Sequence, residues 1–242
     1  MKTATALLGL VSGAGFGAGR ILMLTAAVAA SALSERPVAA QDYRSSAGWN
    51  AGAVWFSPLN GSAAAINGAS AGDIQLDPGW IIGMQFEQWI GGGRTGWRLN
   101  GALTERPLQF PGDSRDTGVW FADFDLLLRL LAPDPQRRAN ATLSIGAGVV
   151  RYKLGDGDPR FFESANATYP GNDKPRFVGV GGLNVDVLTG WRWDGEPVGL
   201  RFELVDHVVL SSPFDPIEGG DFAPVHNVRF VIGAFAGWGL LR

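Results

Sequence analysis

Residues 183–204 alternate between two kinds of side chain on either side of a short polar turn. One alternate series is apolar apart from a single threonine: Leu183, Val185, Val187, Thr189, Trp191, Val198, Leu200, Phe202 and Leu204. Most of the other series is glycine, polar or charged: Asn184, Asp186, Gly190, Arg192, Gly199, Arg201 and Glu203. A period of two around the turn at 194–197 predicts a β-hairpin. Because a soluble core does not contain a face of full charges, we expect the apolar face to contact lipid and the charged face to line a closed barrel.

The same alternation recurs in eight segments of the chain. They are 48–56, 79–90, 97–104, 119–131, 140–152, 177–193, 198–210 and 228–238. They predict an all-β fold, an eight-stranded antiparallel up-and-down transmembrane β-barrel. In membrane barrels the short connections lie on the periplasmic side and the long ones outside. We therefore expect periplasmic turns at 91–96, 132–139 and 194–197, and external loops at 57–78, 105–118, 154–176 and 211–224.

The predicted inward series contains five acidic and five basic side chains. They are Glu87, Asp123, Asp125, Asp186 and Glu203, with Arg98, Arg129, Arg192, Arg201 and Arg229. An eight-stranded barrel is just wide enough to be filled by its own side chains. We therefore expect these charges to pair as an internal network in place of an apolar core. Glu87 and Arg98 are symmetric about the turn at 91–96 and should be direct cross-strand partners.

The predicted outward series is apolar, with tryptophans toward the segment ends, where an amphipathic ring can lie among lipid headgroups. We place one girdle at the periplasmic ends and one at the external ends. The periplasmic girdle is Trp49, Trp97, Trp191 and Trp238, and the external girdle is Trp55, Trp80 and Trp120. Apart from Asp206, near the external end of its segment, this series carries no formal charge. A charge there would cost about 2–4 kcal/mol at the membrane midplane, so its absence supports contact with lipid.

The N-terminus and the composition bound the remaining possibilities. Lys2 and Arg20 precede an apolar run at 21–33, and small residues follow at 38–40, which predicts a secretory signal cleaved after Ala40. We divide the 242 residues into a leader, 1–40, and one barrel domain, 41–242, with a mitochondrial presequence or a retained anchor as alternatives for the leader. The chain has no cysteine, which excludes disulfides and thiolate metal sites. Its net charge of -3 and lack of a basic stripe argue against nucleic acid as a partner.

The pattern of strand number, loop length, girdles and leader resembles the small eight-stranded bacterial outer-membrane proteins, the group that includes the OmpA transmembrane domain, OmpX and OmpW. In that group the last strand ends in an aromatic residue that the assembly machinery recognises. Here the alternation ends at Trp238, and the chain continues as Gly239-Leu240-Leu241-Arg242. The resemblance implies a monomer in the bacterial outer membrane, with outer-membrane lipid and the assembly machinery as its partners.

The residues assign no catalytic, cofactor-binding or metal-binding site. Glu203, His207 and Ser211 share a strand face, but four strand residues span about 13 Å, whereas proton transfer needs about 3 Å. His207 and His226 should lie on opposite faces of the wall by regular alternation. The acidic stretch at 156–173 matches no established calcium loop.

We therefore expect a non-enzymatic barrel with a structural or adhesive role that acts through its external loops. A narrow channel or carrier for small hydrophobic molecules and a lipid-modifying enzyme are the alternatives within the same architecture. A soluble barrel of lipocalin type, with its apolar series facing inward, is the architectural alternative.

Overall fold

The computed structural model describes residues 43–57, 59–63, 72–110, 113–132, 138–154, 175–210 and 224–240. The predicted leader, 1–40, and the acidic stretch at 156–173 lie outside these ranges. Within them, no helix is long and apolar enough to cross a membrane.

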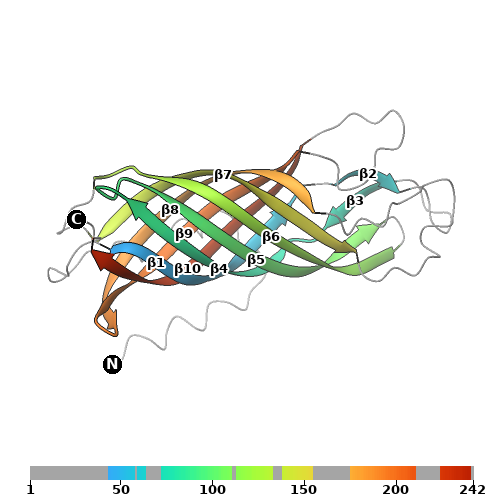
Figure 1. The fold of residues 1–242 in the computed structure, drawn as a ribbon. Helices are drawn as coiled ribbons and strands as arrows, with labels where there is room; N and C mark the ends of the chain where they lie inside the picture. The colour runs from blue at the N-terminus through green and yellow to red at the C-terminus, as the bar shows by residue number, and fades with distance from the viewer. Residues whose placement is uncertain are drawn as a thin grey trace, which may run out of the picture. The chain divides into compact units, whose positions relative to one another are not determined.

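Eight long strands form a closed antiparallel barrel, which confirms the predicted fold class (Figure 1). They are β1 (Tyr43–Phe56), β4 (Gly79–Ile90), β5 (Thr95–Phe110), β6 (Asp113–Arg129), β7 (Ala139–Leu154), β8 (Arg176–Trp193), β9 (Glu196–Val209) and β10 (Val225–Leu240). Each strand pairs with the next along the chain, and β10 returns to pair with β1. The barrel therefore has a turn end, where the short connections after β4 and β8 lie, and an opposite loop end.

Two predicted external loops contain strands. The predicted loop at 57–78 includes β2 (Leu59–Ala63) and β3 (Gly72–Leu76), and β3 pairs with the far end of β5. The predicted loop at 105–118 is a continuation of the β5–β6 ladder, which extends until Phe110 lies opposite Asp113. Both segments were predicted to lack strands, and this was wrong because we recognised strands by apolar alternation alone. Beyond the lipid-facing band, a pair of strands can continue with polar side chains as long as its backbone groups remain hydrogen-bonded.

The outer wall of the barrel is apolar, as the alternation predicts. Exposed outward side chains come from all eight strands, and Ile145, near the middle of β7, is 70% exposed. Five of the seven girdle tryptophans are also exposed, while Trp97 and Trp120 are partly covered. Trp49 and Trp120, however, lie near the middle of β1 and β6 rather than at a strand end, because β1 begins at Tyr43 and β6 at Asp113. The glycine and polar residues that precede Trp49 hid the first part of β1.

The turn between β8 and β9 has the backbone that a two-residue hairpin loop requires. Asp194 and Gly195 have positive φ angles of 53° and 84°, which match the right-handed twist of the flanking strands. The ladder shifts register between Leu188 and Arg192. Because of this irregularity, inward and outward side chains no longer alternate strictly before the turn, and Arg192 is exposed.

Candidate functional site

A layer of charged side chains crosses the interior of the barrel, and Arg201 is one of its two centres. Its guanidinium donates to Glu87 at 2.5 and 2.7 Å and to Asp186 at 2.6 and 2.7 Å. Asp186 lies directly opposite Arg201 on β8, whereas Glu87 comes from β4, three strands away around the ring. Arg201 is 1% exposed. One guanidinium therefore neutralises two carboxylates that have no access to water.

Arg98 forms the second centre of the layer and spans the interior. It donates to Asp125 on the neighbouring strand at 2.8 Å and to Glu203 on β9, which lies on the opposite side of the ring. The predicted register is confirmed, since Glu87 and Arg98 are direct cross-strand neighbours. Their closest charged atoms are nevertheless 3.9 Å apart. Each residue has a shorter ion pair with another side chain, because several partners reach the same central space.

A third group lies toward the loop end of the layer. The Nε2 atom of His207 is 3.0 Å from Asp123, and Arg229 lies 3.9 Å from both Asp123 and Glu203. The ring of His207 packs against Phe121 with their centroids 4.9 Å apart. His207 was predicted to share a strand face with Glu203, and both side chains are buried inside the barrel.

Arg129 is buried inside the barrel but is held mainly by aromatic rings. Its guanidinium lies 3.7 Å from the Trp89 ring centroid and 5.4 Å from that of Tyr43. Among the described residues, its terminal nitrogens have no hydrogen-bond partner. Arg129 is therefore buried among the predicted lumen charges, but aromatic rings rather than a hydrogen-bonded carboxylate contact its terminal nitrogens. Stacking on an electron-rich ring face stabilises a desolvated guanidinium without a carboxylate.

Arg192 does not belong to the interior. Its side chain is exposed at the turn end and donates to the carbonyl oxygen of Gly195 at 2.6 Å. The prediction that it belongs to the lumen network was wrong, because strict alternation was assumed across the register shift that follows Leu188. The buried layer therefore has five carboxylates, four guanidinium groups and His207.

Apolar side chains close the interior on both sides of the charged layer. The cluster at the loop end is rich in valine and includes Val119, Phe121, Val178, Val205 and Val231. The cluster at the turn end consists of Tyr43, Trp89, Leu127, Leu188 and Phe235. The prediction that charges replace an apolar core was wrong in this respect. Near the loop end both faces of several strands are apolar, so alternation could not identify the inward face there.

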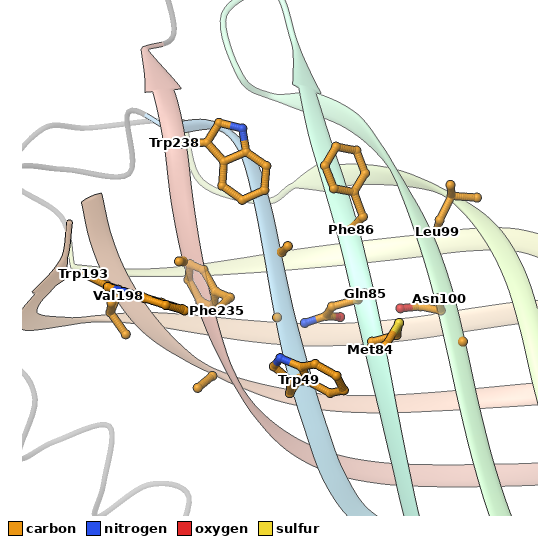
Figure 2. A pocket seen from close by; sticks show the side chains of 15 residues that line it. Trp49, Met84, Gln85, Phe86, Leu99, Asn100, Trp193, Val198, Phe235 and Trp238 are labelled. Atoms are coloured by element: carbon orange, nitrogen blue, oxygen red, sulfur yellow. The ribbon is translucent and has the colours of Figure 1, made fainter. Parts of the chain in front are cut away.

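A hollow lies beside β1, β4, β5 and β10, and Trp193 of β8 and Val198 of β9 also line it (Figure 2). It has a volume of about 640 Å³. Its apolar lining includes Trp49, Phe86, Trp193, Phe235 and Trp238, and the polar side chains of Gln85 and Asn100 also line it. Sequence reasoning missed Trp193, which follows the register shift in β8. Most of the lining is apolar, so the surface of the hollow suits hydrocarbon rather than a polar ligand.

Comparison with solved structures finds small outer-membrane proteins. Neisserial surface protein A matches with a TM-score of 0.49 and 11% identity, over 80% of this chain and 97% of that one. The outer membrane protein OprG of Pseudomonas aeruginosa matches with a TM-score of 0.46 and 11% identity, over 82% and 98% of the two chains. Outer membrane protein W of E. coli matches with a TM-score of 0.36 and 13% identity, over 82% and 100%.

These proteins belong to the kind of small barrel that the sequence pattern resembles. No protein-family model matches the chain, and no curated protein matches it.

Proposed function

We propose that this chain is an integral protein of the bacterial outer membrane, closed to transport and active at its external surface. The observation that carries the proposal is the inversion of polarity across the barrel wall. Charged side chains such as Arg98 and Arg201 are buried inside, while Ile145 and Trp191 are exposed on the outside. Only an apolar solvent outside the wall makes this arrangement favourable, because exposed apolar surface is otherwise driven inward.

The filled interior favours a surface role over a channel. Ion pairs from β5 to β9 and from β4 to β9 connect strands that are not neighbours, so they cross the space that a pore would occupy. Apolar clusters lie on both sides of these pairs. A hydrated ion would have to separate charge pairs that have no water to replace their lost contacts. In the proposed role the protein is a monomer surrounded by outer-membrane lipid, and its external connections contact binding partners outside the cell.

The folded chain should produce no discrete conductance steps in a planar bilayer. The physical reason is the continuous packing of the charged layer against the apolar clusters inside the barrel. Insertion is checked in the same bilayer by protease protection of the strands, and an open porin serves as the positive control. Regular steps from correctly inserted protein would contradict a closed interior and favour the narrow-channel alternative.

A further inference from the structure

Three polar side chains meet on the outer face of the barrel near its loop end. Asp206 is on β9, His226 is the second residue of β10, and Ser57 directly follows β1. The three strands are consecutive in the sheet, so the residues lie in the order aspartate, histidine, serine across the wall. This group is separate from the buried layer, because His226 is exposed whereas His207 is buried on the inward side. The predicted placement of the two histidines on opposite faces is thereby confirmed.

Hydrogen bonds link the three residues. The Nδ1 atom of His226 lies 2.7 Å from Oδ2 of Asp206. The backbone N–H of His226 donates to Oγ of Ser57 at 2.8 Å, and the backbone N–H of Ser57 donates to the carbonyl oxygen of His226 at 2.9 Å. The side chains of His226 and Asp206 are 49% and 36% exposed. The group is therefore both internally bonded and accessible from outside.

Asp206 is unusual for its position on the wall. It interrupts an outward series that is otherwise apolar, and its cross-strand neighbours are Val228 and Gly181. Its Oδ1 atom has no hydrogen-bond partner among the described residues. A partly exposed ion pair contributes little to stability, so stability alone does not account for a carboxylate here. Ionisable groups on a lipid-facing surface are costly, and those that occur commonly serve a function.

The arrangement provides the parts of a nucleophilic serine. A carboxylate bonded to Nδ1 fixes the histidine ring and leaves Nε2 as the nitrogen that accepts a proton. Directly paired residues on neighbouring strands have Cβ atoms about 4.5–5.5 Å apart, so Ser57 lies beside His226. In this structure the Ser57 hydroxyl oxygen accepts from the backbone N–H of His226, so catalysis requires a rotation about χ1 that turns the hydroxyl toward Nε2 of the ring. Catalytic contacts of this kind are often loose before substrate binds.

The surroundings indicate the class of substrate. Trp55 and Val228 form the next outward cross-strand pair below Ser57, and their apolar side chains continue the lipid-facing wall. On the other side of Asp206, a Cβ atom added to Gly179 or Gly181 would meet no atom within 4 Å, so the surface there is open. In a membrane lipid, the ester carbonyl lies between the acyl chains and the headgroup. The geometry points to Ser57, His226 and Asp206 as a hydrolytic site for acyl esters of membrane lipids.

The reaction balances with water as the second substrate. Ser57 Oγ attacks the ester carbonyl carbon while its proton passes to Nε2 of His226. The bond from that carbon to the alcohol oxygen then breaks, and His226 returns the proton to the leaving alcohol. Water, deprotonated by His226, attacks the resulting acyl-serine and releases a fatty acid and free Ser57. Asp206 acts as a positioning residue that holds the ring. This activity would add to the proposed surface role and is independent of the closed interior.

The test uses the full chain folded in detergent micelles, an alkyl fluorophosphonate and p-nitrophenyl octanoate. We expect the fluorophosphonate to label Ser57, as located by mass spectrometry of the labelled peptide. Ser57→Ala should lose the label and lower ester hydrolysis by about 10³-fold or more, and Asp206→Asn should lower kcat by about 10²–10⁴-fold. Ser45→Ala is the matched control, because Ser45 lies on the same strand near the turn end and should retain both signals.

Folding of every variant is checked by heat-modifiable gel mobility. If Ser57→Ala does not fold, peptide mapping on the wild-type chain and the hydrolysis rate of His226→Gln decide the question. Absence of label at Ser57 in folded wild-type protein would overturn the proposal. Equal hydrolysis by the wild type and by a folded Ser57→Ala or His226→Gln variant would also overturn it.

Discussion

Replacing Arg201 with alanine should lower the free energy of unfolding by about 3–5 kcal/mol, the typical loss when one partner of a buried ion pair is removed. The guanidinium bonds to both Glu87 and Asp186, and all three residues are almost fully buried. Without it, Asp186 loses both of its bonds to Arg201, and Glu87 keeps, among the described residues, only the longer 3.9 Å ion pair with Arg98. The measurement is urea unfolding of the chain in phospholipid vesicles, followed by tryptophan fluorescence and by the heat-modifiable gel shift.

Arg192→Ala is the matched control for this experiment. Arg192 carries the same charge on the same hairpin, but it is exposed and donates to the turn carbonyl of Gly195. We expect its replacement to change the free energy of unfolding by less than about 0.5 kcal/mol. Equal effects of the two replacements would mean that the buried layer does not support the barrel as described.

Replacing Ile145 with arginine should be the most harmful single change on the outer wall. Ile145 lies near the middle of β7 and is 70% exposed, so a charge there would enter the hydrocarbon of a surrounding membrane. We expect a loss of about 2–4 kcal/mol in unfolding free energy in phosphatidylcholine vesicles, measured by the same urea titration.

Leu210→Arg provides the control at the membrane edge. Leu210 is 62% exposed and follows the last residue of β9 at the loop end. Near the interface the same charge should lower the free energy of unfolding by only about 0–1 kcal/mol. A chain whose outer wall faces water would show no difference between the two positions.

The sequence was sufficient to predict the barrel and the polarity of its wall. Where one face of a strand is apolar and the other is charged, as around Asp186 and Arg201, only one orientation places the charged face inside the barrel. The structure shows this orientation, with both residues buried. The same logic placed Glu87 opposite Arg98, because a tight turn fixes the register of a hairpin.

The errors have three physical sources. The register shift after Leu188 moved Arg192 out of the interior, and a bulge of this kind leaves no mark in an alternating pattern. The valine-rich loop end of the strands is apolar on both faces, which hid the apolar cluster around Val119 and Val205. The β5–β6 ladder continues beyond the apolar band with polar residues, which resemble a loop when apolar alternation is the criterion.

The external group could not be found from spacing along the chain. Ser57 and His226 are 169 residues apart, and they become neighbours only because β10 returns to β1. Asp206 and His226 are 20 residues apart on strands joined by a long connection. Two features of the sequence pointed to this group. Asp206 is a single charge in an apolar outward series, and His226 also falls at an outward position of its strand.

Site-directed spin labelling of β7 tests directly which face of the wall contacts lipid. The chain has no cysteine, so single cysteines at 142, 143, 144, 145 and 147 can each be labelled cleanly. In phospholipid vesicles we expect labels at 143, 145 and 147 to collide often with dissolved oxygen and rarely with a water-soluble nickel complex. Labels at 142 and 144 should be shielded from both. The opposite alternation, with 143, 145 and 147 shielded and 142 and 144 accessible, would contradict a lipid-facing apolar wall around a closed, charged interior.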